Sequence, residues 1–477
     1  MKKELQQQVR AWIGMAAVLL GVGVSLSTYA ETQVERQVES MALPVHTAFF
    51  TGSELTYFDG LEEAGIVVLN ERAQVLHARS AQRHFIPAST TKVLTALLAL
   101  RHWGADYRFK TIFLLKGQSA LEQASPSRSA PRLHVKGYGD PYLVSEELIA
   151  IAKTLAARLK AGGVVALSGI ELDTGYYAPN LKMPGASESD NPYDAIPSAL
   201  AANFNTLYIR KTATGFESAE PQTPLTPTAL QIAKKITQFE KTPSGLTKRV
   251  NLGGDERVGQ RYFAELLAVF LRKEGIAVGD DIHWQSHSQS VKEMVESAGL
   301  QAVKNTRNSS LKMLYLHENS RTLDEVIRPM LLYSTNFIAH QLALSLSADK
   351  MGEPADQQSV AQVTQQSLAS LFDWSDFTVE EGAGLSRENR LSPLQLIDVL
   401  DAFKPWRTLL PEVVPNVFAK SGTLSGVSTL AGYIHTDRGW YPFAFMINQN
   451  VPYGYRNQLA KALSQNSFSV PVTADTE

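Results

Sequence analysis

Residues 93–100 constrain the fold more than any other part of this sequence. They read VLTALLAL, so a helix built from them is apolar on nearly every face. Such a helix belongs in a protein core, because at a surface an apolar face would meet water. The polar residues PASTTK at 87–92 directly precede it. The sequence therefore predicts a buried helix whose first turn carries Ser89 and Lys92.

Ser89 and Lys92 form the pattern S-x-x-K, which suits a serine nucleophile with its own base. The start of a helix carries unsatisfied N–H groups and the positive end of the helix dipole, and both favour an oxyanion. Lys92 lies one turn later on the same face, and burial that lowers its pKa would let it accept the serine proton. Capping serines are also common, and the pattern recurs at 309–312 and 347–350. Alone it does not identify a catalytic site.

A second chemical signal lies near the C-terminus. KSGTLSG, which begins at Lys420, is the only K-[ST]-G in the sequence, and it opens a segment that reads as strands. A lysine on the rim of a strand can hold a substrate carboxylate, with Ser421, Gly422 and Thr423 beside it. The backbone N–H of Thr423 can complete an oxyanion hole with that of Ser89.

Three segments match S-x-N, the pattern that supplies a second hydroxyl and an amide to serine acyl-transfer sites. SDN at 189–191 lies in a loop rich in Gly and Pro, and SQN at 464–466 enters the polar tail. STN lies in an apolar helical segment after Pro329, which is expected to break or kink the preceding helix. We therefore select Ser334 and Asn336 of STN.

Together these motifs resemble the low-molecular-mass class C penicillin-binding proteins, the D-alanyl-D-alanine carboxypeptidase/endopeptidases of the penicillin-binding protein 4 type. A long insertion marks that family, and here 244 residues separate Lys92 from Asn336. Four further segments resemble the family: KGYGDPYL at 136–143, SALAANFNTLYI at 198–209, GAGLSRENRLSP at 382–393 and STLAGYI at 428–434. The chain departs from the usual S-D-N and K-T-G without losing their hydroxyl and amide groups, and Ala383 stands where a serine is usual.

The resemblance implies a multidomain α/β (α+β) fold. A β-lactamase-like or transpeptidase-like serine domain, with a five-stranded antiparallel sheet between helix clusters, would comprise residues 31–93 and 291–477. Two smaller inserted domains, mostly β, would complete the chain. One would comprise residues 94–116 and 192–290, and the other, nested within it, residues 117–191.

The resemblance also implies a mechanism on peptidoglycan stem peptides. Ser89 would attack the carbonyl between two D-alanines, Lys92 would accept its proton, and Ser334 would relay a proton to the leaving amine. Asn336 would orient the acyl amide, and Lys420 would bind the terminal carboxylate. β-Lactam antibiotics such as penicillin would acylate the same serine. No metal or cofactor is implied.

Endopeptidase action, which is usual in that family, needs a pocket for a zwitterionic side chain on the cross-link. Arg387 is the candidate for its carboxylate, and Asp190 with Tyr193 for its ammonium group and methylenes. The alternative is that Arg387 makes a structural salt bridge and that Asp190 caps a turn.

Composition excludes several other functions. The net charge of −2 and the lack of a Lys/Arg stripe argue against nucleic-acid binding. The absence of cysteine excludes disulfides, zinc thiolates and thiol nucleophiles. His283 and His287 of HWQSH are expected to be a solvated surface pair rather than metal ligands.

The first thirty residues are typical of a secretory signal peptide. Lys2, Lys3 and Arg10 precede a 16-residue apolar core, and small residues lead to a cleavage site after Ala30. The alternative is an uncleaved anchor, although a membrane span needs about 20 apolar residues. The sequence therefore predicts a periplasmic protein, with loose association with the membrane or cell wall left open.

Two other functions stay open. A β-lactamase would need a base for deacylation, and Glu380 and Glu381 lie between S-x-N and K-S-G, where class A enzymes carry a glutamate. The other alternative is a non-catalytic peptidoglycan-binding scaffold of the same fold.

Overall fold

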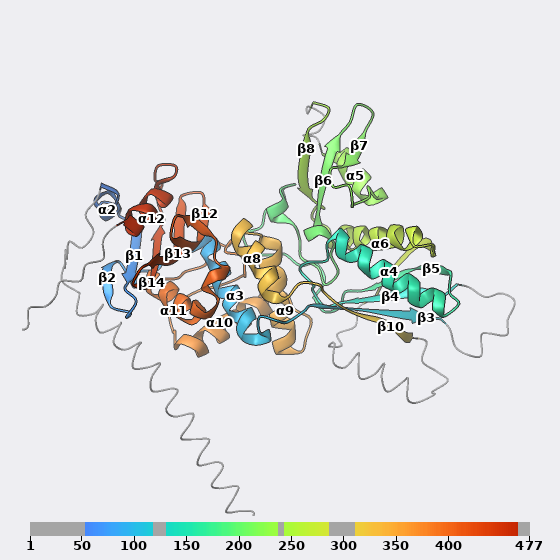
Figure 1. The fold of residues 1–477 in the computed structure, drawn as a ribbon, viewed down its shortest axis with the longest axis horizontal. Coiled ribbons are helices and arrows are strands. Elements are labelled where there is room, and N and C mark those ends of the chain that lie inside the picture. The colour runs from blue at the N-terminus through green and yellow to red at the C-terminus, as the bar shows by residue number, and fades with distance from the viewer. Residues whose placement is uncertain (1–52, 118–129, 237–242, 286–310, 466–477) are drawn as a thin grey trace, which may run out of the picture.

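The computed structural model describes residues 53–117, 130–236, 243–285 and 311–465 (Figure 1). The predicted signal peptide and its cleavage site lie outside these residues. A six-stranded sheet occupies one end of the long axis, a five-stranded sheet lies towards the other end, and helices lie between them (Figure 1). Within the described residues, no helix has both the length and the apolar character needed to cross a membrane.

The six-stranded sheet is antiparallel throughout and draws its strands from two distant parts of the chain. In sheet order they are β11 (Glu412–Val414), β12 (Val417–Leu424), β13 (Val427–Thr436), β14 (Gly439–Ile447), β1 (Ala64–Leu69) and β2 (Val75–Arg79). Val67 of β1 lies opposite Ala444 of β14. The expected antiparallel sheet is confirmed, and the three-residue edge strand β11 makes six strands where five were expected.

Helices cover both faces of this sheet. Side chains alternate along a strand, so Ile66 and Val68 join one hydrophobic cluster while Val67 and Leu69 join another. The first cluster includes α2 (Ser53–Asp59) and α12 (Tyr455–Gln465). The second includes α3 (Thr91–Trp103), α8 (Leu323–Tyr333), α9 (Asn336–Met351), α10 (Gln357–Phe372), α11 (Pro393–Phe403) and the 3₁₀ helix η6 (Lys404–Leu409). The expected sheet between helix clusters is therefore confirmed.

Helix α3 is the buried helix that residues 93–100 predict. Every residue from Thr91 to Leu100 is buried, and α8, α9 and α11 pack around the helix. It continues to Trp103 and ends at Gly104, whose φ of 81° suits glycine. The expected domain boundary after residue 93 therefore cuts through this helix, and its C-terminal part belongs to the core of the serine domain.

A second sheet forms the centre of the inserted region. In sheet order its strands are β10 (Leu311–Glu318), β3 (Lys110–Lys116), β4 (Arg132–Gly137), β5 (Ala166–Asp173) and β9 (Ala277–Gln285). Helices α4 (Ser145–Ala161) and α6 (Glu256–Lys273) share a hydrophobic cluster with it. The boundaries expected from sequence would place these strands in three different domains. The structure joins them in one sheet, because strand pairing links segments that no local composition marks.

A smaller lobe projects from the inserted region (Figure 1). It contains β7 (Phe216–Ser218), β6 (Thr206–Lys211), β8 (Thr247–Asn251) and helix α5 (Pro227–Lys235). The 3₁₀ turns η3 (Pro192–Asp194) and η4 (Asn203–Asn205) precede β6, and both contact α9. These turns bring the inserted region against the helix that begins with Asn336.

Candidate active site

Ser89 lies in the 3₁₀ turn η1 (Ala88–Thr90), directly before α3. The hydroxyls of Thr90 and Thr91 donate to the carbonyls of Pro87 and Ala88, which fixes the turn. Ser89 itself is half-buried between buried neighbours. The turn is thus rigid, and its serine retains access to solvent at the N-terminal end of the buried helix.

Lys92 is fully buried, and its amine meets three neutral acceptors. Nζ lies 3.1 Å from Oγ of Ser89, 2.8 Å from Oδ1 of Asn336 and 2.6 Å from the carbonyl oxygen of Ala383. Burial and then the nearby cation Lys420 hold the pKa of Lys92 well below its ordinary value. A neutral amine here can donate to Asn336 and Ala383 while its lone pair accepts the proton of Ser89.

The S-T-N motif forms the junction between α8 and α9. Of the break or kink expected at Pro329, the break does not occur, because helix α8 continues to Tyr333. The chain then turns at Ser334, whose φ is 56°, and α9 begins at Asn336. Ser334 is half-buried, and its hydroxyl makes no hydrogen bond to another residue in the described part of the chain. This hydroxyl is therefore available to a substrate.

The K-S-G strand, β12, passes directly beside the serine turn. A side chain on Gly422 would come within 2.7 Å of the Pro87 carbonyl and 2.9 Å of the Ser89 nitrogen, so only glycine permits this approach. Thr429 of the neighbouring strand also donates to the Pro87 carbonyl, at 2.7 Å. The backbone of β12 is thereby held against the turn that carries Ser89.

Lys420 is the second buried lysine of the site. It is 1% exposed, and Nζ donates to the carbonyl of Ser421 at 2.7 Å. Burial and then the charge of Arg456 lower the pKa of Lys420 to about 7. Arg456, from α12, donates to the Gly422 carbonyl at 2.9 Å and to the Thr423 hydroxyl at 2.8 Å. Two cationic groups therefore border this strand.

Behind Lys92 lie two further ionisable side chains, Glu381 and His340. Both are buried, with 3.7 Å between Nδ1 of His340 and Oε2 of Glu381. Burial lowers the pKa of His340 to about 4, although Glu381 opposes the shift. The imidazole is therefore neutral near pH 7, and Glu381 is the carboxylate that faces the lysine.

The structure places the three candidates for a side-chain pocket differently. Arg387 is at the rim, where Nη2 donates to the carbonyl of Ser425, in the turn after β12, at 2.6 Å. Tyr193 is 54% exposed, and its carbonyl accepts from Nδ2 of Asn336 at 3.0 Å, so this residue reaches the site. The carboxylate of Asp190 instead forms an ion pair with Lys248 of β8 at 2.9 Å.

The rival motif matches do not meet Lys92. Ser189 of the literal S-D-N donates its hydroxyl to Asp194 within a loop. Ser347 of the later S-x-x-K is buried in α9, where it donates to the Ala343 carbonyl at 2.8 Å, and Lys350 donates to Ser367. Part of the S-x-x-K match at 309–312, and the last residue of SQN, lie outside the described residues.

Two side chains around the site, Arg456 and His340, lie in helices without a recognised motif, and the sequence does not indicate them. A third, Glu381, is indicated by the sequence only as the possible base of a β-lactamase. Each reaches the site through a contact with a segment that is distant in the chain. We find no local pattern that could have identified Arg456 or His340.

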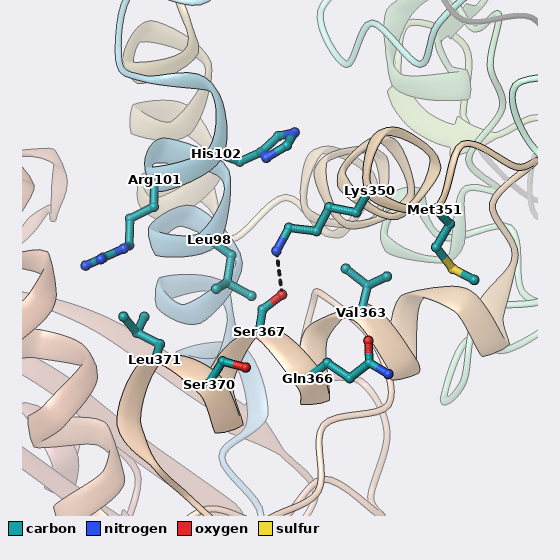
Figure 2. Close-up of a pocket in the computed structure, with 10 residues that line it drawn as sticks. All are labelled: Leu98, Arg101, His102, Lys350, Met351, Val363, Gln366, Ser367, Ser370 and Leu371. Carbon is teal, nitrogen blue, oxygen red and sulfur yellow. Dashed lines mark hydrogen bonds between the residues drawn. The ribbon is translucent and has the colours of Figure 1, made fainter. Parts of the chain in front are cut away.

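A cavity of about 690 Å³ opens between α3, α9 and α10 (Figure 2). It lies at the end of α3 away from Ser89, and Lys350 and Ser367 join across it by a hydrogen bond of 2.8 Å. Its lining residues are Leu98, Arg101, His102, Lys350, Met351, Val363, Gln366, Ser367, Ser370 and Leu371. None belongs to the site described above.

The described residues contain no cluster of three or more histidine, aspartate or glutamate side chains suited to a metal ion. His283 of HWQSH lies in β9, and its ring nitrogen Nε2 is 2.9 Å from Asp281. His287 lies outside the described residues.

Comparison with known proteins agrees with this architecture. The model of the D-Ala-D-Ala carboxypeptidase 3 (S13) family matches residues 58–416 and 406–466. A D-alanyl-D-alanine carboxypeptidase of Actinomadura sp. (strain R39) is 24% identical over 442 residues, which cover 82% of this chain and 78% of that protein. Penicillin-sensitive carboxypeptidase A of Dictyostelium discoideum is 23% identical over 412 residues, which cover 73% of this chain and 74% of that protein.

Solved structures share the fold. Penicillin-binding protein 4 of Haemophilus influenzae superposes with a TM-score of 0.64 at 19% identity, covering 87% of this chain and all of that one. The same protein in complex with a novel β-lactam superposes with a TM-score of 0.59, covering 86% of this chain and 99% of that one. The implied α/β fold with a penicillin-binding-protein-like serine domain is therefore confirmed.

Proposed function

Because the chain belongs to the D-Ala-D-Ala carboxypeptidase 3 (S13) family of peptidases, we propose that it is a serine-type D-Ala-D-Ala carboxypeptidase and DD-endopeptidase acting on peptidoglycan stem peptides. The observation that carries the proposal is the position of Lys92. Its buried amine lies 3.1 Å from the Ser89 hydroxyl, and its other acceptors are neutral. This arrangement supports a nucleophile and base acting as a pair.

Acylation then proceeds in defined steps. Lys92 accepts the proton of Ser89 while the oxygen attacks the carbonyl between two D-alanines. The backbone N–H groups of Ser89 and Thr423 stabilise the oxyanion, which the close approach of β12 at Gly422 supports. Ser334 passes a proton to the leaving amine, and water releases the shortened peptide.

Substrate binding falls to the strand and the asparagine. Lys420 binds the terminal carboxylate of the peptide, together with Ser421 or Thr423. Arg456, which donates to Thr423, adds positive charge to the same strand. Asn336, held by Lys92, orients the acyl amide. A β-lactam carries a carboxylate and a reactive carbonyl, so the same groups acylate Ser89 with penicillin.

For endopeptidase action we assign the cross-link side chain to the rim between Arg387 and Tyr193. Arg387 is exposed beside the turn after β12, and the Tyr193 backbone is tied to Asn336. Asp190 is a weaker candidate because Lys248 already neutralises its carboxylate. Arg387→Ala should reduce the cleavage of cross-linked dimers to monomers in purified peptidoglycan and leave penicillin acylation unchanged. An unchanged muropeptide profile would remove Arg387 from this role.

A fluorescent penicillin tests the proposal directly. The wild-type chain should form a covalent adduct that survives denaturing electrophoresis and release D-alanine from a stem pentapeptide. Ser89→Ala should lose both, whereas Ser347→Ala and Ser309→Ala, from the other S-x-x-K matches, should keep them. Labelling that persists in Ser89→Ala would refute the proposed nucleophile, and an unlabelled wild type would favour the non-catalytic scaffold.

The same labelling experiment distinguishes the proposed carboxypeptidase from a β-lactamase, because a β-lactamase would release the adduct rapidly. Both carboxylate oxygens of Glu381 already accept backbone N–H groups, and Glu380 accepts the Ser386 hydroxyl at 2.6 Å. Neither glutamate is therefore poised to activate water, and we expect a slowly released adduct. Rapid turnover of nitrocefin would favour the β-lactamase instead.

We also propose that the protein acts in the periplasm after removal of residues 1–30. A peptidoglycan substrate lies outside the cytoplasmic membrane, and the N-terminal sequence is typical of a signal peptide. N-terminal sequencing of the protein from a periplasmic extract should begin at Glu31. Recovery of the intact N-terminus in the membrane fraction would support the uncleaved anchor.

A further inference from the structure

We infer that Glu381 is a positioning residue for Lys92: its carboxylate folds the loop at 382–389 into the shape that presents the Ala383 carbonyl to the lysine amine. The inference rests on the proposed function, in which Lys92 takes the proton of Ser89.

The carboxylate of Glu381 is the centre of this loop. It is fully buried, and Oε2 accepts from the backbone nitrogen of Ala383 at 2.7 Å. Oε1 accepts from the nitrogens of Leu385, at 2.7 Å, and Ser386, at 3.2 Å, and from Nδ2 of Asn389 at 3.0 Å. A buried carboxylate is tolerated where such donors surround it, and charge-assisted hydrogen bonds of this kind are strong. One side chain thus fixes four points of the loop.

The loop in turn grips the helix that carries the base. The carbonyl of Ala383 accepts from Nζ of Lys92 at 2.6 Å, and that of Gly382 accepts from the Thr95 hydroxyl at 2.6 Å. Lys92 and Thr95 are one turn apart on α3. Two successive carbonyls of the loop therefore hold two successive positions on one face of the helix.

The next residue of the loop contacts the serine turn itself. Gly384 has a φ of 82°, and a side chain there would lie 1.9 Å from the carbonyl oxygen of Ala88. No L-residue with a side chain fits this position. The loop is therefore packed against both ends of the Ser89–Lys92 pair, and a change in its shape moves the carbonyl that Lys92 contacts.

Glu381 also acts on Lys92 through its charge. The ionisable groups that face the amine are Lys420 from β12, Glu381 from the loop and His340 from α9, with Arg456 beyond Lys420. Glu381 raises the pKa of Lys92, whereas burial and Lys420 lower it. Neutralising Glu381 therefore lowers that pKa further.

Glu380 provides a matched control on the same loop. It is half-buried, and its carboxylate accepts from the Ser386 hydroxyl at 2.6 Å. Its backbone nitrogen donates to Asn389. Glu380 thus has the same chemistry and contacts the same loop, but it is not among the groups that shift the pKa of Lys92.

The test compares full-length Glu381→Gln, Glu381→Asp and Glu380→Gln with the wild type. The rate constant for acylation by a fluorescent penicillin is measured across pH, together with the thermal midpoint of unfolding. In Glu381→Gln an NH₂ group replaces one carboxylate oxygen and cannot accept a backbone N–H, so the maximal rate should fall about tenfold or more. The acid limb of its profile should move to lower pH, because the anion is gone. In Glu381→Asp, which keeps a carboxylate, the acid limb of the pH profile should stay where it is in the wild type. Glu380→Gln should match the wild type in both the maximal acylation rate and the position of the acid limb.

Two results would overturn the inference. The first is that Glu381→Gln shows the same maximal rate constant for acylation and the same acid limb of the pH profile as the wild type. The second is a rate that falls only in step with the thermal midpoint while the limb stays in place, which would leave Glu381 a purely structural residue. A wild type that is not labelled at Ser89 is distinguishable from both, since it refutes the proposed function and the inference with it.

Discussion

Two buried lysines, one in each half of the molecule, differ in what surrounds their amines. Lys136 in β4 of the inserted sheet donates to the equally buried carboxylate of Asp173 at 3.0 Å. Lys92 in α3 contacts a hydroxyl, an amide oxygen and a carbonyl oxygen. Burial lowers the pKa of both; Asp173, a direct partner, opposes the shift at Lys136, whereas at Lys92 Lys420 adds to the shift and Glu381, which is not a direct partner, opposes it. The direct acceptors of Lys92 are all neutral, which suits the base that we propose.

The neighbours of Lys136 extend the same contrast. In the same sheet, Nδ1 of His134 in β4 lies 2.8 Å from the carboxylate of Glu171 in β5, and Nζ of Lys116 in β3 lies 2.9 Å from the same carboxylate. Burial acts to raise the pKa of Glu171, but Lys116 and His134 hold it below the ordinary value. These charges satisfy one another, so the cluster in the inserted sheet contributes structure rather than reactivity.

The largest effect is expected from Lys92→Met. If Lys92 is the general base that we propose, its loss should lower the rate of acylation by penicillin about 10²- to 10⁴-fold. The fold should remain stable, because methionine fills the place of the apolar stem and no carboxylate loses its direct partner. Stopped-flow or gel-based labelling measures the acylation rate, and a thermal melt measures the stability of the fold. Acylation at the wild-type rate would contradict the role of this lysine.

Lys136→Met should show the opposite behaviour. It removes the lysine from the buried carboxylate of Asp173, which keeps a contact with Nε2 of His134 at 3.8 Å, so the free energy of unfolding should fall by at most about 3–5 kcal/mol. Acylation measured below the melting temperature should change little, because the site lies in the other half of the molecule. Urea-induced unfolding measures the loss, and adding Asp173→Leu should recover much of it. If Lys136→Met lost acylation but not stability, the proposed contrast between a structural Lys136 and a reactive Lys92 would be wrong.

The pH dependence of substrate binding sharpens the comparison at Lys420. With a pKa of about 7, this lysine loses its charge as the pH rises, so kcat/KM for a peptide with a free terminal carboxylate should decline above about pH 7. A methyl ester of the same peptide should not show the decline. If kcat/KM for the free peptide stays constant up to pH 9, the assignment of Lys420 is contradicted.

The lowered pKa of Lys420 also affects the pH dependence of stability. Between this pKa and 10.5, Lys420 is protonated in the unfolded chain but not in the folded one, so this group makes the free energy of unfolding rise with pH in that range.

The smallest effect is expected from Lys116→Met. This lysine is about a third exposed, and Glu171 keeps its contacts with His134 and with Gln285 at 3.1 Å. The cost to stability should therefore be about 0.2–1 kcal/mol, as for other ion pairs open to solvent. The same urea titration measures it, with Lys136→Met as the reference. A cost equal to that of Lys136→Met would show that the cluster acts as one unit.

The part of this architecture that the sequence predicts is the part with a local pattern. The apolar run at 93–100 predicts a fully buried helix, and α3 is one. The choice of S-T-N over the literal S-D-N remains a prediction about catalysis; in the structure, Asn336 contacts Lys92 while Ser189 contacts Asp194. In both cases the apolar character of a single segment carried the information.

What the sequence does not predict depends on contacts between distant segments. The domain boundaries differ because β3 pairs with β10, which comes much later in the chain, and because α3 runs past the expected boundary. Glu381 and Arg456 reach the site across the fold; the position of Glu381 between S-x-N and K-S-G indicates only a possible deacylation base, and no motif indicates Arg456. Of the break or kink predicted at Pro329, the break does not occur, since α8 continues past the proline to Tyr333.

The order in which the chain is made gives the six-stranded sheet a further consequence. Strand β1 is an early element of the chain, but it pairs with β14, the last strand of the described residues, and Lys420 lies in β12 only shortly before β14. A chain that ends before β12 therefore contains Ser89 and Lys92 but neither the central strands of this sheet nor Lys420. Under the proposed function, a chain should become active only after nearly all of its length has been made and has folded.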